Sequence, residues 1–238
     1  MKLAALIFSF MIAGSLACSD DHCKDPNLAN ELLAVRFLPS GKQLENLCPK
    51  VLTFLECEKE YFECQGQSLE ELASSSDKTV ASNANAMLGG ISLVRDLCDE
   101  DSSFHHGYTE SVECFRGYIA NAGRMCHQDV ARPLDDFFDV LYPSEDDITE
   151  GAFSEIRCLR ETLELACVID NLSDACGSVA QETAMTVLRK MKPALKQKIC
   201  EGVENSAELK SRFLDFLEFD DEKRERVQGI LDLIKRRK

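Results

Sequence analysis

Cysteine is the residue type whose number and spacing could do the most chemistry in this chain. The 238 residues include twelve cysteines, compared with four histidines and no tryptophan. Twelve thiols could close disulfides, bind zinc or react. They are Cys18, Cys23, Cys48, Cys57, Cys64, Cys98, Cys114, Cys126, Cys158, Cys167, Cys176 and Cys200.

The spacing of these cysteines does not indicate a zinc site. The chain has no Cys-x-x-Cys pair, and no histidine follows two cysteines at the distance found in zinc fingers. An even number of cysteines in a secreted chain is instead typical of disulfides. We therefore expect all twelve to be cross-linked, with no metal and no cofactor.

The N-terminal residues have the pattern of a secretory signal peptide. Met1-Lys2 is a short basic start, and the apolar run from Leu3 to Gly14 is too short to span a bilayer. Small residues at Ser15 and Ala17 predict cleavage after Ala17, so that residues 1–17 are removed. A bacterial lipoprotein signal, with Cys18 as first residue, is the alternative; it prefers a larger aliphatic residue at the position of Ser15. No later stretch is apolar enough to cross a membrane, and we expect a secreted, extracellular protein.

The charge of the chain argues against nucleic-acid binding. The formal net charge is −15, and residues 18–222 carry 40 acidic and 19 basic side chains. A nucleic-acid-binding protein needs Lys and Arg to neutralise phosphates. We interpret the acidic body as a solubility feature.

Residues 223–238 form a basic tail with seven basic and two acidic side chains. Its apolar residues fall on one side of a predicted helix, so the tail could contact an anionic surface. The alternative is that the helix packs on the chain's own acidic body, held by opposite charge, or that the tail is trimmed. The acidic body would itself be repelled by an anionic surface. We favour the second interpretation. The apolar residues are Val227, Ile230, Leu231 and Ile234.

Catalytic chemistry is not indicated. The adjacent pair His105-His106 would point to different faces of a helix, and His22 and His127 belong to no motif. Nucleophile-elbow, phosphate-loop and zinc-protease motifs are missing, and with 42 carboxylates any acidic pair could arise by chance. We expect a protein that is not an enzyme, with no catalytic and no metal-binding residue.

One N-glycosylation sequon is present, Asn171-Leu172-Ser173. It falls where the helical pattern is expected to break, which would let a glycosyltransferase reach Asn171. The sequence therefore predicts a glycoprotein with its glycan at Asn171.

The elements that must position the cysteines are helices, because apolar residues recur at steps of three and four and convincing alternating strands are absent. We expect a helix to start at Pro49, Pro193 to interrupt one, and the segment from Pro133 to Pro143 to hold only a short helix. The expected helices are 26–37, 49–64, 78–94, 104–126, 137–141, 152–169, 179–191, 209–217 and 227–234. The fold class is therefore all-α, a disulfide-stapled helical bundle.

The cysteines fall into two similar groups, which predicts two related helical-hairpin units. Cys48 and Cys57 are nine positions apart, as are Cys158 and Cys167. Nine helical residues rise about 13.5 Å, whereas the α-carbons of bridged cysteines lie within about 7 Å, so each must reach another element. In antiparallel hairpins this favours Cys48–Cys98 and Cys158–Cys200, among thousands of possible connectivities. A duplication explains the similarity, although two hairpins with like spacing could arise independently.

We place the boundary between these units at the acidic stretch 144–147. The first cysteine-rich unit is then 18–143 and the second 144–205, followed by C-terminal helices with the basic tail in 206–238.

The cysteine pattern resembles that of the twenty-seven-kilodalton haemolymph glycoproteins of arthropods. The resemblance covers roughly residues 44–200 and rests on spacing. Cys18, Cys23 and the basic tail have no place in that pattern. It implies a secreted helical protein with no known catalytic residues, so no active site can be transferred. The residues that carry it are Cys48, Cys57, Leu97-Cys98, Glu113-Cys114-Phe115, Cys126, Cys158, Cys167, Cys176 and Cys200.

Two classes of function follow. The first is a haemolymph- or venom-type extracellular protein that acts through surface contacts with an unknown extracellular protein. The second is a carrier of a small apolar ligand, similar to the odorant-binding proteins of insects. The second and third cysteines of those carriers are separated by three residues, and no such pair occurs here.

Overall fold

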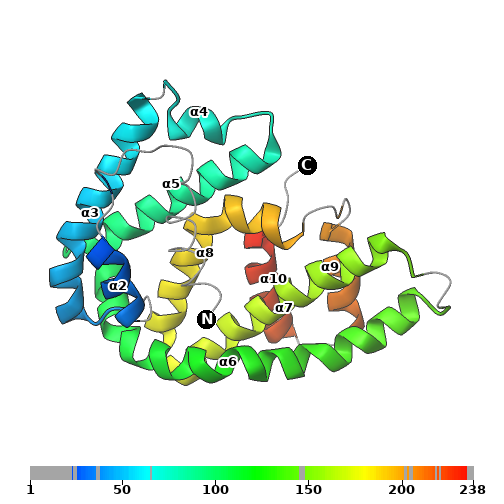
Figure 1. Ribbon diagram of the computed structural model, residues 1–238. Coiled ribbons are helices and arrows are strands. Elements are labelled where there is room, and N and C mark those ends of the chain that lie inside the picture. The colour runs from blue at the N-terminus through cyan, green and yellow to red at the C-terminus, as the bar shows by residue number, and fades with distance from the viewer. Residues whose placement is uncertain are drawn as a thin grey trace. The chain divides into compact units, whose positions relative to one another are not determined.

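The computed structural model is all-α over the residues that it describes (Figure 1). These are Cys23, 26–35, 38–64, 66–144, 148–200, Val203, 206–217, Phe219 and 221–234. The predicted signal peptide, Cys18 and His22 lie outside them. The helices are α2 (Pro26–Ala34), α3 (Gly41–Cys64), α4 (Leu69–Ala73), α5 (Lys78–Cys98), α6 (Ser103–Leu141), α7 (Glu150–Cys176), α8 (Ser178–Ile199), α9 (Ser206–Phe216) and α10 (Asp221–Ile234).

The chain forms two compact units, which divide within α6. The first extends to Arg116 and the second begins at Gly117. This division differs from the one placed at 144–147 from the cysteine groups. The boundary falls inside α6, which also continues through the residues between the expected helices 104–126 and 137–141.

Three prolines lie inside helices, and here the sequence-based expectation was wrong. Pro49 is in α3, Pro133 in α6 and Pro193 in α8. A proline in a helix interior costs about 3 kcal/mol, because its N–H is missing and its ring clashes with the preceding turn. The residues after Pro133 offset this cost: Leu134 and Phe137 are buried, and each contributes about 1.5–3 kcal/mol.

The core of the first unit joins α2, α3, α4 and α5. One cluster of buried residues includes Leu28 on α2, Val51 on α3, Leu69 on α4 and Val94 on α5. The short helix α4 was not predicted. Its start is fixed by a capping box, in which Ser68 and Glu71 each accept a hydrogen bond from the other's backbone N–H.

The core of the second unit is aromatic. Phe137 on α6 meets Phe213 on α9 edge to face, with ring centroids 5.1 Å apart, and both belong to the same buried cluster as Leu159 on α7. This T-shaped geometry sets the positive edge of one ring on the negative face of the other.

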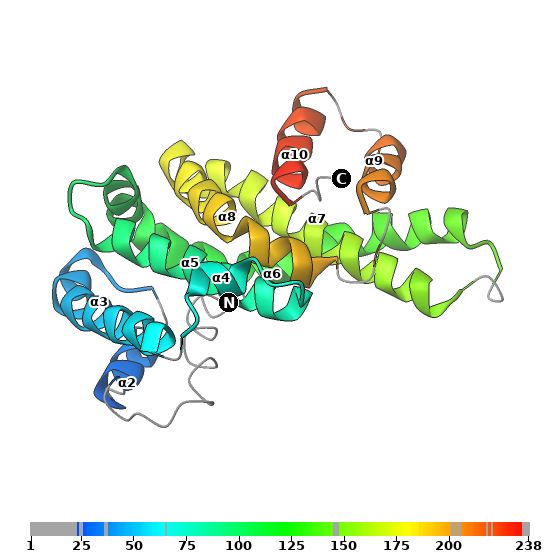
Figure 2. The same cartoon turned by 90° about the horizontal axis from the view of Figure 1, so that it is seen from above.

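The C-terminal helix α10 lies against α7 and α8 within the second unit (Figure 2). Val227, Ile230 and Leu231 are all buried. The apolar side of the basic tail therefore faces the protein's own body, as favoured from the sequence. Residues 235–238 lie outside the described part of the chain.

Candidate functional site in the disulfide framework

Disulfides join helices within both units, and the two predicted bridges are confirmed. The bridges, with the distance between α-carbons, are Cys23–Cys57 (5.5 Å), Cys48–Cys98 (5.5 Å), Cys126–Cys167 (5.7 Å) and Cys158–Cys200 (4.6 Å). Cys114 and Cys176 are disulfide-bonded as well. Cys64 ends α3, and its side chain is outside the described part.

The nine-residue spacing places two bridges on opposite sides of one helix. Nine residues make two and a half turns of an α-helix, so the second side chain points about 180° away from the first. On α3, Cys48 therefore reaches the end of α5 while Cys57 reaches Cys23. On α7, Cys158 reaches the residue after α8, and Cys167 reaches α6. Each of these helices is held covalently on two sides.

The bridges have the same interlocked order in both units. Among the four cysteines of the two described bridges in each unit, the first in chain order bonds the third and the second bonds the fourth. This order relates Cys23, Cys48, Cys57 and Cys98 to Cys126, Cys158, Cys167 and Cys200. The correspondence of Cys23 with Cys126 was missed from the sequence, because their distances to the next cysteine differ. Shared connectivity supports a duplication.

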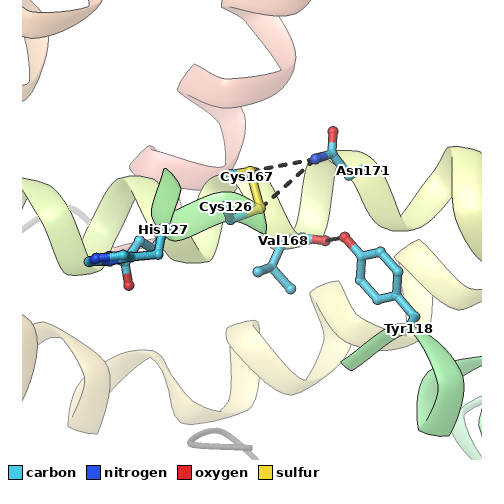
Figure 3. The surroundings of a disulfide bond; sticks show 7 residues. Tyr118, Cys126, His127, Cys167, Val168 and Asn171 are labelled. Carbon is cyan, nitrogen blue, oxygen red and sulfur yellow. Dashed lines mark hydrogen bonds and ion pairs between the residues drawn. A yellow bond between two sulfur atoms is a disulfide. The ribbon is translucent and has the colours of Figure 1, made fainter. Parts of the chain in front are cut away.

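The bridge Cys126–Cys167 is surrounded by polar groups from two helices (Figure 3). Tyr118 on α6 donates a hydrogen bond of 2.8 Å to the carbonyl oxygen of Val168 on α7. Burial raises the pKa of the Tyr118 phenol, and the nearby Asp170 carboxylate raises it further. Next to Cys126 in the chain, Nδ1 of His127 lies 2.7 Å from Oε1 of Glu164 on α7.

Asn171 lies within α7, and the predicted break in the helix near this residue was wrong. The helix continues to Cys176 because Ile169 and Leu172 are both buried on it. Asn171 is half-buried, and its Nδ2 points at the bridge, 3.5 Å from Sγ of Cys167 and 3.9 Å from Sγ of Cys126. Cys167 and Asn171 are neighbours because residues four apart share a helix face.

The remaining described histidines have structural contacts. Nδ1 of His105 lies 2.6 Å from the carbonyl oxygen of Leu97, which can only accept, so Nδ1 carries the proton. His105 thereby satisfies a carbonyl at the end of α5 from the first turn of α6. The rings of His105 and His106 meet edge to face with centroids 6.0 Å apart. Among the described residues, no group of three or more His, Cys, Asp or Glu side chains could hold a metal ion.

Compared with family models, curated proteins and solved structures, the chain has no match. The resemblance to the haemolymph glycoproteins stays an expectation drawn from cysteine spacing.

The connection between α2 and α3 is anchored by two side chains of α6. The buried Tyr108 hydroxyl donates to the Pro39 carbonyl at 2.8 Å, and burial raises the pKa of this phenol. Arg116 donates to the Leu38 carbonyl from Nε at 3.0 Å and from a terminal nitrogen at 2.7 Å. These hydrogen bonds give the backbone carbonyls of Leu38 and Pro39 donor partners.

Within the described ranges, no helix is long and apolar enough to span a bilayer. The disulfide framework holds neighbouring helices together covalently in both units. The groups that the sequence singled out are brought together only in part, at Cys126, Cys167, His127 and Asn171.

Proposed function

We propose that this chain is a secreted, non-enzymatic helical protein that acts through surface contacts in an extracellular fluid of the haemolymph or venom type. The interlocked disulfides, repeated in the same order in both units, support the proposal most strongly. Such bridges form and persist in oxidising compartments and are rare in the cytosol.

Cross-linking suits a protein that must keep its surface in a dilute, protease-rich fluid. Each native disulfide typically adds about 2–4 kcal/mol by restricting the unfolded chain, and bridges that share a helix do not simply add. The net charge of −15 keeps the molecule soluble and favours partners with a basic or neutral face.

Secretion of the full chain from eukaryotic cells under residues 1–17 tests the compartment. We expect the protein in the medium, with Cys18 as its first residue and a native mass that shows no free thiol. Retention in the cell, several free thiols or a bound metal ion would overturn the proposal.

Ligand binding distinguishes surface contact from transport. A fluorescent fatty-acid probe titrated into the purified secreted protein should show no saturable binding. Saturable binding that unlabelled fatty acid reverses would replace the proposal with a carrier of a small apolar ligand.

A further inference from the structure

The sequon Asn171-Leu172-Ser173 is closed to a glycosyltransferase in the folded second unit. The enzyme must reach three consecutive residues, but Leu172 is 3% exposed and Asn171 is half-buried in a continuous helix. A glycan is bulky and needs an exposed site. Glycosylation of Asn171 therefore has to precede the packing of α7.

The atom that would carry the glycan is already used in the folded unit. Nδ2 of Asn171 lies at hydrogen-bonding distance from both sulfurs of the bridge Cys126–Cys167. A sugar on Nδ2 would replace one of its two hydrogens and require the side chain to turn away from the sulfurs. Asn171 therefore cannot carry a glycan on Nδ2 and keep the observed contacts of Nδ2 with the two sulfurs.

The order of the chain lets the bridge close first. Cys126 and Cys167 precede Asn171 by 45 and 4 residues, so both thiols enter the secretory compartment ahead of the sequon. Closing the bridge then draws α6 and α7 together around Asn171.

We propose that closure of Cys126–Cys167 competes with glycosylation of Asn171 and so sets how many chains carry a glycan. This inference rests on the proposed secretion. In closure, the two thiols lose two protons and two electrons to the disulfide of an oxidoreductase, which becomes a dithiol. In glycosylation, Nδ2 bonds to the anomeric carbon of a lipid-pyrophosphate-linked oligosaccharide, the bond from that carbon to the pyrophosphate oxygen breaks, the lipid pyrophosphate leaves, and an amide proton passes to a base of the transferase.

The test is glycan occupancy in chains that can and cannot form the bridge. The mature chain is expressed in eukaryotic cells behind the signal peptide of a well-secreted protein, as wild type and as C126S/C167S. Occupancy is the fraction of chains whose electrophoretic mobility, measured under reducing conditions, changes when N-linked glycans are removed. It is measured in cell-associated and secreted pools together, so that a variant that folds poorly is still scored.

Two controls isolate the local effect. C48S/C98S removes a bridge of the first unit and leaves Asn171 untouched, and S173A abolishes the sequon. We expect occupancy to rise about twofold or more in C126S/C167S, to stay at the wild-type level in C48S/C98S and to vanish in S173A. Equal occupancy in wild type and C126S/C167S would overturn the inference. So would an equal rise in both bridge variants, since slow folding in general would then be the cause.

The inference and the proposed function fail separately. If residues 1–17 do not direct secretion, the proposed function fails, while the competition is still measured behind the foreign signal peptide. If residues 1–17 direct secretion and glycan occupancy at Asn171 is the same with and without the bridge, only the inference fails.

Discussion

Arg226 on α10 donates from Nε to Oδ1 of Asp170 on α7 across 2.8 Å, and the Asp170 side chain is only 9% exposed. This ion pair joins the C-terminal helix to the helix that carries Cys158 and Cys167. Cys200 is the last cysteine in the chain, so α9 and α10 are held without a covalent link of their own.

Replacing Asp170 with Asn should loosen α10. The expected loss is about 1 kcal/mol, because Arg226 is partly exposed and solvent screens the pair. In D170N, backbone amide hydrogen exchange should become faster than in the wild type in residues 221–234 and change little in α3. E182Q is the matched control: it removes the exposed pair of Glu182 with Arg189 on α8 and should leave exchange in α10 unchanged. Equal effects of the two variants would contradict a docking role for Asp170.

The disulfides should differ in their resistance to a mild reductant without denaturant. Thiolate attack needs access to sulfur, and both cysteines of Cys23–Cys57 are partly exposed, whereas Cys158 and Cys126 are fully buried. We expect Cys23–Cys57 to open first, as judged by stepwise alkylation and peptide mass mapping. Earlier opening of Cys158–Cys200 would show that access does not set the order.

Tyr142 makes folding sensitive to alkaline pH. Its hydroxyl donates to Oε2 of Glu155 at 2.6 Å, and burial, followed by this hydrogen bond, raises its pKa to about 12. Because the pKa of Tyr142 is higher in the folded state than in the unfolded state, its protonated phenol contributes fully to the free energy of unfolding below pH about 10. This contribution is lost as the pH rises through about 12.

Absorbance titration of tyrosine ionisation measures this effect. Y142F should remove one ionisation step near pH 12, and E155Q, which keeps the packing, should move that step toward pH 10. An unchanged step in E155Q would mean that Glu155 does not act on the phenol.

Two glycines should respond to alanine with opposite signs. Gly123 is an exposed helical residue of α6 with open space around its missing β-carbon, so G123A should stabilise by about 0.5–1 kcal/mol. Gly177 joins α7 to α8 with φ of 86° and ψ of 167°, a conformation that only glycine adopts readily. G177A should destabilise by about 1–3 kcal/mol. Chemical denaturation with the disulfides intact measures both, and changes of the same sign would contradict the argument.

Much of the fold could be predicted because it depends on local patterns. The apolar steps along α5 and α6 predict helices, and the Asp77 side chain caps the start of α5. The start of α4 was also present in the sequence, as Ser68 three residues before Glu71, and was missed because polar residues follow it.

The sequence by itself determined the helical class, because helical rise and side-chain period are properties of a few neighbouring residues. It also favoured the bridges Cys48–Cys98 and Cys158–Cys200, which the structure contains. Only the tertiary structure decided that α6 runs through Pro133, that Asn171 faces a disulfide, and that the apolar side of α10 is covered. These outcomes depend on which distant parts of the chain pack against each segment. At Pro133, the free energy gained by burying Leu134 and Phe137 outweighs the cost of the missing backbone hydrogen bond. A local sequence pattern does not show which side chains will be buried.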